Sequence, residues 1–221
     1  AIAIGSEASA SGSNSIAMGQ QSEASGLYSI SLGMISKATG SDSIAIGVRS
    51  DDRGARGNQS IAIGYLAGAI SDYGTALGAS AEANEYSTAL GTSTTASSTY
   101  STAIGNNANA SNTDAVAIGS RGVTASGESS VAIGSKADAA ITTASGSGSI
   151  AIGDGAVATG DWSVALGTMT EAKGLNNVAL GINACKGVTG SNKTCIGADS
   201  GPSSSEAQAS DNSNVVYIGT T

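Results

Sequence analysis

Large and small side chains alternate in a five-residue cassette that recurs along the chain in the form small residue, aliphatic, Ala, aliphatic, Gly. Typical copies occupy residues 15–19, 43–47 and 101–105. A period of two places both aliphatic side chains on one face of a β-strand, whereas a helix would separate them. Each cassette therefore predicts a short strand.

The cassettes return at a nearly fixed period, and the commonest step between their closing glycines is 14 residues. The closing glycines are residues 5, 19, 33, 47, 64, 78, 91, 105, 119, 134, 153, 167, 181, 197 and 219. Between cassettes lies a weaker Ala-x-Ala run, as at 8–10 and 81–83, which predicts a second strand. Two strands of about five residues and two turns of about two leave no room for a helix. We therefore expect an all-β parallel solenoid of about 15 two-strand rungs.

Glycine and the irregular steps predict where the corners and insertions lie. The glycine that closes each cassette is expected at a corner where φ is positive, or where the next rung leaves no space for a Cβ. Steps longer than 14 residues place insertions in the turns, and we expect any binding specificity to reside there. These segments are 49–56, 140–146, 185–195 and 198–206.

The first strand has no face suited to water. It carries aliphatic residues on one side and Ser, Ala or Gly on the other, so both sides are expected to be buried. Packing volume favours aliphatics such as Ile44 and Ile46 between the two sheets, with Ala45 facing a partner chain; the opposite assignment stays open. Because alanine buries little apolar area, and the chain has no Phe, we expect it to self-associate along the solenoid.

Composition argues against an enzyme and against a cofactor. The chain has no histidine, which removes the common nucleophilic triads and zinc sites. Two pairs of acids resemble a glycosidase pair, Asp51 with Asp52 and Glu82 with Glu85, but solvated surface charge is the interpretation that we favour. Single aspartates that we interpret as turn formers rather than ion ligands are Asp42, Asp114, Asp154 and Asp161.

Charge and hydropathy restrict the partners. The formal net charge is −8, which opposes nucleic acid and anionic membrane as partners. No stretch reaches the roughly 18 apolar residues that a membrane span needs, so we expect no direct membrane contact by this segment.

Two features are candidate partner-binding sites. The first insertion alternates charge and is either an internally paired loop or a mixed-charge contact for a protein or glycan; its charged residues are Arg49, Asp51, Asp52, Arg53 and Arg56. Trp162 lies in a predicted turn, where an aromatic residue either packs over the turn or serves as a binding hot spot. The tyrosines at 28, 65, 73, 86 and 100 lie in or near turns in the same way.

Threonines suggest one rival function. Thr75, Thr88 and Thr102 replace the first aliphatic of consecutive cassettes, and stacked threonine arrays on flat solenoids order ice. Such arrays repeat Thr-x-Thr on an exposed strand, whereas these threonines fall in a strand that we expect to be buried.

The Ser-Ile-Ala-Ile-Gly cassette, the Ala-x-Ala-x-Gly run and the 14-residue step resemble the YadA-like head repeats of trimeric autotransporter adhesins of Gram-negative bacteria. The resemblance covers essentially the whole chain and implies a single head domain, 1–221: a left-handed parallel β-roll assembled as a side-by-side homotrimer. It also implies non-enzymatic attachment, at the bacterial cell surface, to host extracellular matrix, host cells or other bacteria. Since the family's signal peptide, stalk and outer-membrane anchor are absent, we expect a fragment of a longer protein. A structural spacer that projects another binding domain is the alternative.

The two cysteines enclose a nine-residue segment. Because the resemblance implies an extracellular location and the chain offers no metal ligand set, a disulfide between Cys185 and Cys195 is expected. If Cys185 projects elsewhere, both thiols remain free.

Overall fold

The computed structural model describes residues 1–47, 53–137, 140–188, 190–201 and 214–219. The chain divides into two compact units, Ala1–Asn107 (unit 1) and Ala108–Thr221 (unit 2). Among the described residues no helix is long and apolar enough to cross a membrane. Arg49, Asp51 and Asp52, which the sequence suggests as partner-binding residues, lie outside the described residues.

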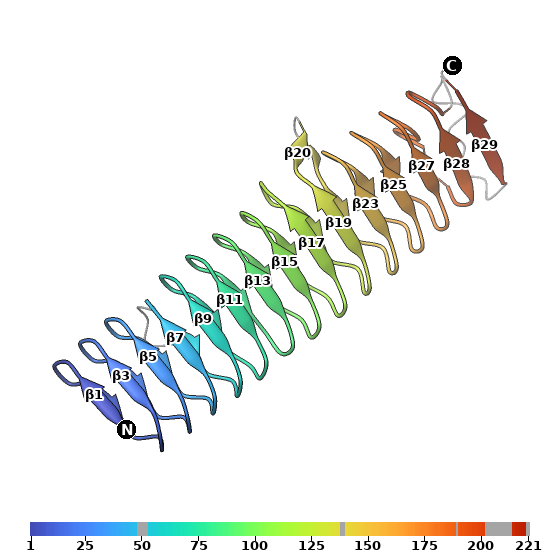
Figure 1. Ribbon diagram of the computed structural model, residues 1–221. Coiled ribbons are helices and arrows are strands. Elements are labelled where there is room, and N and C mark those ends of the chain that lie inside the picture. Colours follow the sequence, from blue (N-terminus) through green and yellow to red (C-terminus); the bar gives the residue numbers. More distant parts are fainter. Residues whose placement is uncertain (48–52, 138–139, 189, 202–213, 220–221) are drawn as a thin grey trace. The chain divides into compact units, whose positions relative to one another are not determined.

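Each unit contains two parallel sheets formed by alternate strands of the chain (Figure 1). In unit 1 the first sheet consists of β1 (Ile2–Ile4), β3 (Ile16–Met18), β5 (Ile30–Leu32), β7 (Ile44–Ile46), β9 (Ile61–Ile63), β11 (Thr75–Leu77), β13 (Thr88–Leu90) and β15 (Thr102–Ile104). The second sheet of unit 1 consists of β2 (Ser9–Ala10), β4 (Glu23–Ala24), β6 (Lys37–Ala38), β8 (Gly54–Ala55), β10 (Gly68–Ala69), β12 (Glu82–Ala83) and β14 (Thr95–Ala96).

Unit 2 repeats this arrangement with more irregular rungs. Its first sheet consists of β17 (Val116–Gly119), β19 (Val131–Gly134), β23 (Ile150–Ile152), β25 (Val164–Leu166), β27 (Val178–Leu180), β28 (Lys193–Ile196) and β29 (Val215–Ile218). Its second sheet consists of β16 (Asn109–Ala110), β18 (Thr124–Ala125), β22 (Thr143–Ala144), β24 (Val157–Ala158) and β26 (Glu171–Ala172). A hairpin, β20 (Lys136–Ala137) with β21 (Ala140–Ile141), is antiparallel.

The register of the sheets follows the repeat. Ala62 of β9 pairs with Ala45 of β7 and with Ala76 of β11, so equivalent cassette positions stack on one another. The parallel solenoid with a period of about 14 residues is confirmed. Fifteen first strands form, but only 12 second strands are present in the described residues, which make about 13 turns rather than 15 two-strand rungs.

The space between the two sheets is filled by small side chains. Ala45 and Ala62 of the first sheet and Ala55 and Ala69 of the second are fully buried, whereas cassette aliphatics such as Ile44 are only half-buried. The packing that we favoured from the sequence, with aliphatics between the sheets, is therefore wrong. The turns that join the strands are only a few residues long and hold the sheets too close together for Ile or Leu to fit.

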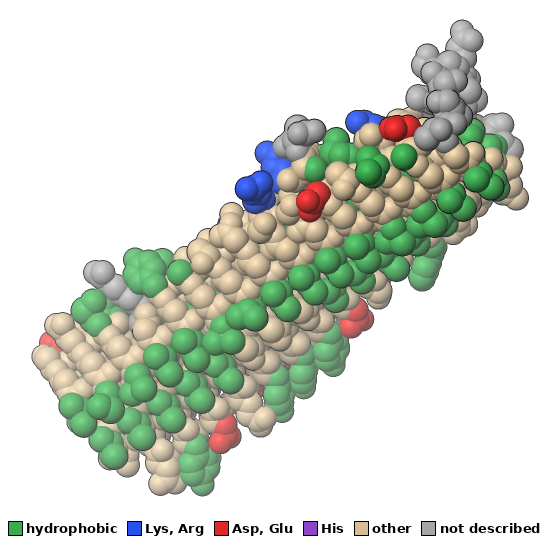
Figure 2. Space-filling model, turned by 45° about the horizontal axis from the view of Figure 1, so that its top comes forward, with side chains coloured by type: hydrophobic (Ala, Val, Ile, Leu, Met, Phe, Trp, Pro, Cys, Tyr) green, Lys and Arg blue, Asp and Glu red, His purple; other side chains and the backbone are tan. Residues whose placement is uncertain are grey.

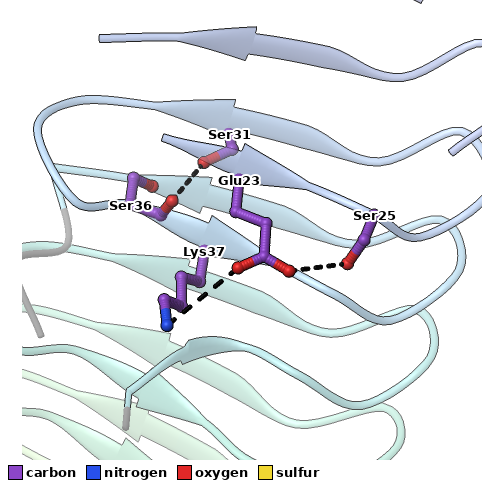
Figure 3. Close-up of polar contacts among 5 residues, drawn as sticks. All are labelled: Glu23, Ser25, Ser31, Ser36 and Lys37. Carbon is purple, nitrogen blue, oxygen red and sulfur yellow. Dashed lines mark hydrogen bonds and ion pairs between the residues drawn. The ribbon is translucent and has the colours of Figure 1, made fainter. Parts of the chain in front are cut away.

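Buried serines take part in this thin interior. In several rungs the serine before a cassette donates its hydroxyl to a carbonyl of the preceding turn, as Ser60 Oγ does to the Gly57 oxygen at 2.7 Å, whereas the buried hydroxyls of Ser130, Ser149 and Ser163 have no hydrogen-bond partner. Ser31 replaces the cassette alanine of β5, and its hydroxyl donates to the Ser36 carbonyl at 2.8 Å (Figure 3). These hydrogen bonds satisfy polar groups that would otherwise be costly to bury.

The glycines that close the cassettes have positive φ, and most of them, though not Gly47 or Gly219, also lie against a neighbouring rung. Gly64 has a φ of 132°, a backbone conformation that other residues rarely adopt. A Cβ at this position would also stand 2.5 Å from the carbonyl oxygen of Gly78 in the next rung. Glycine is therefore required at this corner by the backbone and by the close approach of neighbouring rungs.

The turns have a regular geometry that the sequence did not reveal. In the first rung, the Ala8 N–H donates to the Gly5 carbonyl at 3.2 Å, and Glu7 between them has a φ of 57°. Asn14 has the same φ in the following turn of that rung. Left-handed residues of this kind end tight turns, and here one of them recurs about every seven residues.

The hairpin β20–β21 lies just before most of the predicted insertion at 140–146, which overlaps it only at Ala140–Ile141 and otherwise contains the regular strand β22. Thr142 closes the base of the hairpin, because its hydroxyl lies 2.6 Å from the Ser135 carbonyl and 2.7 Å from the Gly153 carbonyl. The same oxygen accepts a hydrogen bond from the Gly155 N–H at 3.2 Å. The hairpin therefore leaves the rung below it intact and projects from it.

Candidate functional site

The outward face of the first sheet in each unit carries two rows of aliphatic side chains. The residues on either side of the cassette alanine, or of the residue that replaces it, point outward, and several remain strongly exposed, such as Ile4 at 54 %, Leu90 at 43 % and Ile152 at 38 %. Figure 2 shows hydrophobic side chains gathered in rows, with acidic and basic residues beside them rather than among them. This surface is apolar and uncharged, and none of the segments that the structure describes covers it.

Three threonines interrupt one of these rows in unit 1. Thr75, Thr88 and Thr102 are paired in register on β11, β13 and β15. Each is followed two residues later by Leu or Ile rather than by a second threonine, so the face lacks the Thr-x-Thr array of an ice-binding sheet. The threonines lie on the outward face, as do the aliphatics that they replace.

The outward face of the second sheet carries the charged residues. Glu23 and Lys37 lie on neighbouring rungs, with 4.0 Å between the carboxylate and the ammonium, and Glu23 also accepts a hydrogen bond from Ser25 (Figure 3). An exposed pair of this kind contributes little stability. The contrast with the first sheet indicates that the second sheet faces solvent.

Two of the charged residues from the first insertion border a hollow on this second face. The Arg53 guanidinium lies 3.2 Å from the Glu82 carboxylate and 3.3 Å from the Leu66 carbonyl oxygen. Arg56 lies at the edge of the same hollow, which measures about 420 Å³. The structure therefore brings Arg53, Arg56 and Glu82 together.

Glu82 and Glu85, which the sequence suggested as a glycosidase-like pair, lie beside different residues. Glu82 is paired with Arg53, and Glu85 lies in the turn beside Tyr86. Asp161 and Asp154 lie in turns. Asp161 Oδ1 accepts a hydrogen bond of 2.8 Å from the Ser147 N–H, and Asp154 Oδ1 accepts one of 2.8 Å from the Ser135 hydroxyl. Within the described ranges, no group of three or more His, Cys, Asp or Glu side chains is placed to hold a metal ion.

Trp162 lies at the third position of a turn and is 64 % exposed. Its indole ring occupies the space over Gly148 in the preceding rung, where a Cβ would stand 2.5 Å from the ring. Gly148 thus leaves room for the indole, which packs over the turn and presents its remaining surface to solvent.

Tyrosines at equivalent turns of three consecutive rungs in unit 1 form a stack. Tyr73 and Tyr86 have ring centroids 4.6 Å apart, and Tyr86 and Tyr100 have centroids 5.1 Å apart. Desolvation by its neighbours raises the pKa of Tyr86, and the charges of Tyr73 and Tyr100 and of Glu85 raise it further. The sequence analysis placed these tyrosines near turns but missed the stack; their spacing of 13 and 14 residues, one rung each, was the available signal.

A disulfide joins Cys185 and Cys195 in unit 2, with their Cα atoms 5.5 Å apart. Both residues are fully buried, and Cys195 takes the interior position of the cassette alanine, paired in register with Ala179. The enclosed segment is also held from outside, because the Gly187 N–H donates to the Glu171 carboxylate at 2.7 Å.

Glu171 is the acid most affected by its surroundings. Partial burial by itself would raise the pKa of Glu171, but the Lys173 ammonium at 2.8 Å and the Gly187 N–H outweigh it and hold this pKa below its usual range. The ionised Glu171 carboxylate therefore anchors the disulfide-bonded segment, which is a structural role. It lies on β26, at the same outward register as Val157.

Comparison with known protein families supports this description of the repeats. The YadA head domain repeat, in a profile of two copies, matches residues 1–22, 10–34, 24–50, 55–81, 83–108, 96–121, 124–140, 144–168 and 163–184. No curated protein matches the chain. Because these repeats cover most of the sequence, the chain belongs to the YadA head family, a non-enzymatic family of adhesin heads.

Proposed function

We propose that this chain forms the head of a trimeric autotransporter adhesin, in which three copies pack through the outward faces of their first sheets. The observation that supports this most directly is the double row of uncharged aliphatic side chains on that face. Continuous apolar surface of this kind on a monomer marks an association site.

Energetics favour the same assembly. The interior of each unit consists mainly of small side chains, with a few larger ones such as Val123 and Val188 in unit 2, and small side chains contribute little hydrophobic stabilisation. Covering the exposed half of one outward Ile adds about 1 kcal/mol, and the row offers two such side chains in most rungs. Side-by-side packing of the rungs would therefore supply much of the apolar burial that a single chain lacks.

The oligomeric state tests this proposal. Light scattering coupled to size exclusion is expected to give three times the mass of the chain for the wild type. The double variant Ile61→Glu/Ile63→Glu places two charges on the apolar face and is expected to be monomeric. A control, Thr95→Glu, places a charge on the outward face of the second sheet and should stay trimeric. A monomeric wild type, or a double variant of unchanged mass, contradicts the proposed assembly.

We further propose that the head attaches to host extracellular matrix, host cells or other bacteria through the second sheet and the turns, displayed at the bacterial cell surface. Arg53, Arg56 and Trp162 are the described candidates for this surface, because each has an exposed or half-exposed side chain away from the apolar rows. A spacer role is the second candidate, since most rungs have short turns and near-identical dimensions. A trimer that binds neither matrix proteins nor cells would support the spacer.

A further inference from the structure

The hollow on the outward face of the second sheet in unit 1 has the features of a ligand site. Its volume is about 420 Å³, within the usual range for small-molecule sites, and one chain forms it alone. Its lining residues come from β8, β10 and β12 and the turns beside them, namely Arg53, Arg56, Gly68, Ile70 and Glu82.

The hollow exists because side chains are missing from two consecutive rungs. The outward position of the second strand is Lys37 on β6 and Glu82 on β12, but Gly54 and Gly68 on the two strands between them. Gly54 is required by the backbone, since its φ is 123° and a Cβ there would collide with the Lys37 carbonyl.

Gly68 is not required by the backbone. Its φ lies outside the left-handed region, and a Cβ at this position would make only ordinary contacts, the nearest being Arg53 Cγ at 3.6 Å. Any residue with good strand propensity is compatible with this conformation. Gly68 is itself buried, and glycine at position 68 leaves room for the aliphatic part of the Arg53 side chain to lie over it.

The groups around this floor have complementary chemistry. Arg53 is oriented by the Glu82 carboxylate at 3.2 Å and the Leu66 carbonyl at 3.3 Å, and a guanidinium has five N–H donors, more than these two contacts use. Glu82 has further lone pairs to accept hydrogen bonds. Ile70, 40 % exposed, forms an apolar wall.

Charge distinguishes this place from the rest of the surface. The chain carries a net charge of −8, whereas the described residues that line the hollow include two arginines, Arg53 and Arg56, and one acid, Glu82. A locally basic hollow on an acidic protein selects an anionic group, and arginine matches the geometry of a carboxylate.

We propose that this hollow binds a carboxylate-bearing sugar residue at the end of an acidic glycan. The sugar carboxylate receives hydrogen bonds from the guanidinium groups of Arg53 and Arg56, and sugar hydroxyls donate to the Glu82 carboxylate. The C–H face of the ring lies against Ile70, and Gly68 keeps the Arg53 side chain in its place beneath the sugar.

An acidic peptide fits the same hollow less well. A Glu or Asp side chain has no donor for the Glu82 carboxylate and fills only a part of 420 Å³. The identification of a glycan as ligand rests on the proposed adhesive function, whereas the hollow itself needs neither the trimer nor adhesion.

Saturation-transfer NMR and calorimetry with the 221-residue chain test the proposal. The probes are the methyl glycoside of N-acetylneuraminic acid, methyl galactoside and a blocked glutamate. We expect binding of the acidic sugar, at least about tenfold weaker binding of the neutral sugar and the glutamate, and loss of affinity by about tenfold or more in Gly68→Val. Arg53→Gln should weaken binding similarly.

The control is Thr95→Val, which changes the equivalent position one rung beyond Glu82 and should bind as the wild type does. Circular dichroism and the oligomeric mass confirm that each variant is folded. No binding of the acidic sugar, undiminished binding in Gly68→Val, or tighter binding of the glutamate would overturn the proposal. If Gly68→Val loses the sugar but the trimer still attaches to cells, the hollow is a sugar site and adhesion uses another surface. If the wild-type chain is a monomer and still binds the sugar, the proposed trimer is refuted but the sugar site is not.

Discussion

Two alanine substitutions four residues apart are expected to have opposite effects on stability. In Gly64→Ala, the new side chain must adopt a φ of 132°, which costs about 1–3 kcal/mol for a residue other than glycine. In addition, its Cβ would lie 2.5 Å from the Gly78 carbonyl oxygen and 2.7 Å from the carbonyl carbon, so the backbone of the next rung has to move.

That movement disturbs the ladder between the two rungs. The Gly78 N–H donates to the Ile63 carbonyl at 2.8 Å, and weakening such a bond costs about 1 kcal/mol more. We therefore expect Gly64→Ala to lower the free energy of unfolding by about 3 kcal/mol or more. In Gly68→Ala the φ is ordinary and the nearest atom is 3.6 Å away, so the free energy of unfolding should rise by about 0.4–1 kcal/mol, through the lower entropy of the unfolded chain.

The assay is urea unfolding followed by far-ultraviolet circular dichroism, at one chain concentration because association stabilises the folded state. The slope of the transition should be compared between variants, since a change of slope would indicate that the folded state itself has altered. Equal effects of the two substitutions, or a greater loss in Gly68→Ala, would refute the argument that rung-to-rung contact dictates glycine at the corners.

Three further predictions concern titration and the disulfide. The pKa of Tyr86 is raised above the usual tyrosine value of 10.0, so a late step should appear when absorbance at alkaline pH is followed, and Tyr86→Phe should remove that step. Because this pKa is raised in the folded state, the contribution of Tyr86 to stability is present below about pH 10 and is lost as pH rises through the folded pKa. Glu171 has a lowered pKa, so its contribution to stability is present above about pH 4.5 and is lost as pH falls through the folded pKa. Glu171→Gln should therefore flatten the acid side of a plot of unfolding free energy against pH. An unchanged acid side would show that the Gly187 contact is not formed in solution. The double variant Cys185→Ala/Cys195→Ala should lower the free energy of unfolding by about 2–3 kcal/mol, because the disulfide is lost. Packing at position 195 should not add to this loss, since alanine is the usual residue at that interior position. An unchanged urea midpoint in the double variant would contradict the prediction.

The sequence alone determined the features that repeat locally. Alternation within the cassette predicted the strands, the 14-residue step predicted parallel pairing in register, and the closing glycines such as Gly64 predicted the corners. Each of these follows from the backbone of one rung or from the contact of identical neighbours. The sequence of a single period is therefore enough to predict the strands, their parallel pairing and the corners.

Only the tertiary structure decided which face of the cassette lies inside. The volumes of Ile44 and Ala45 favoured the wrong assignment, because the distance between the sheets depends on turn geometry that no single strand reveals. The tyrosine stack and the hollow over Gly68 likewise arise from residues one or more periods apart, brought into contact by the coil. Those contacts depend on the rotation and rise of each rung, and these are properties of the folded solenoid rather than of the repeat.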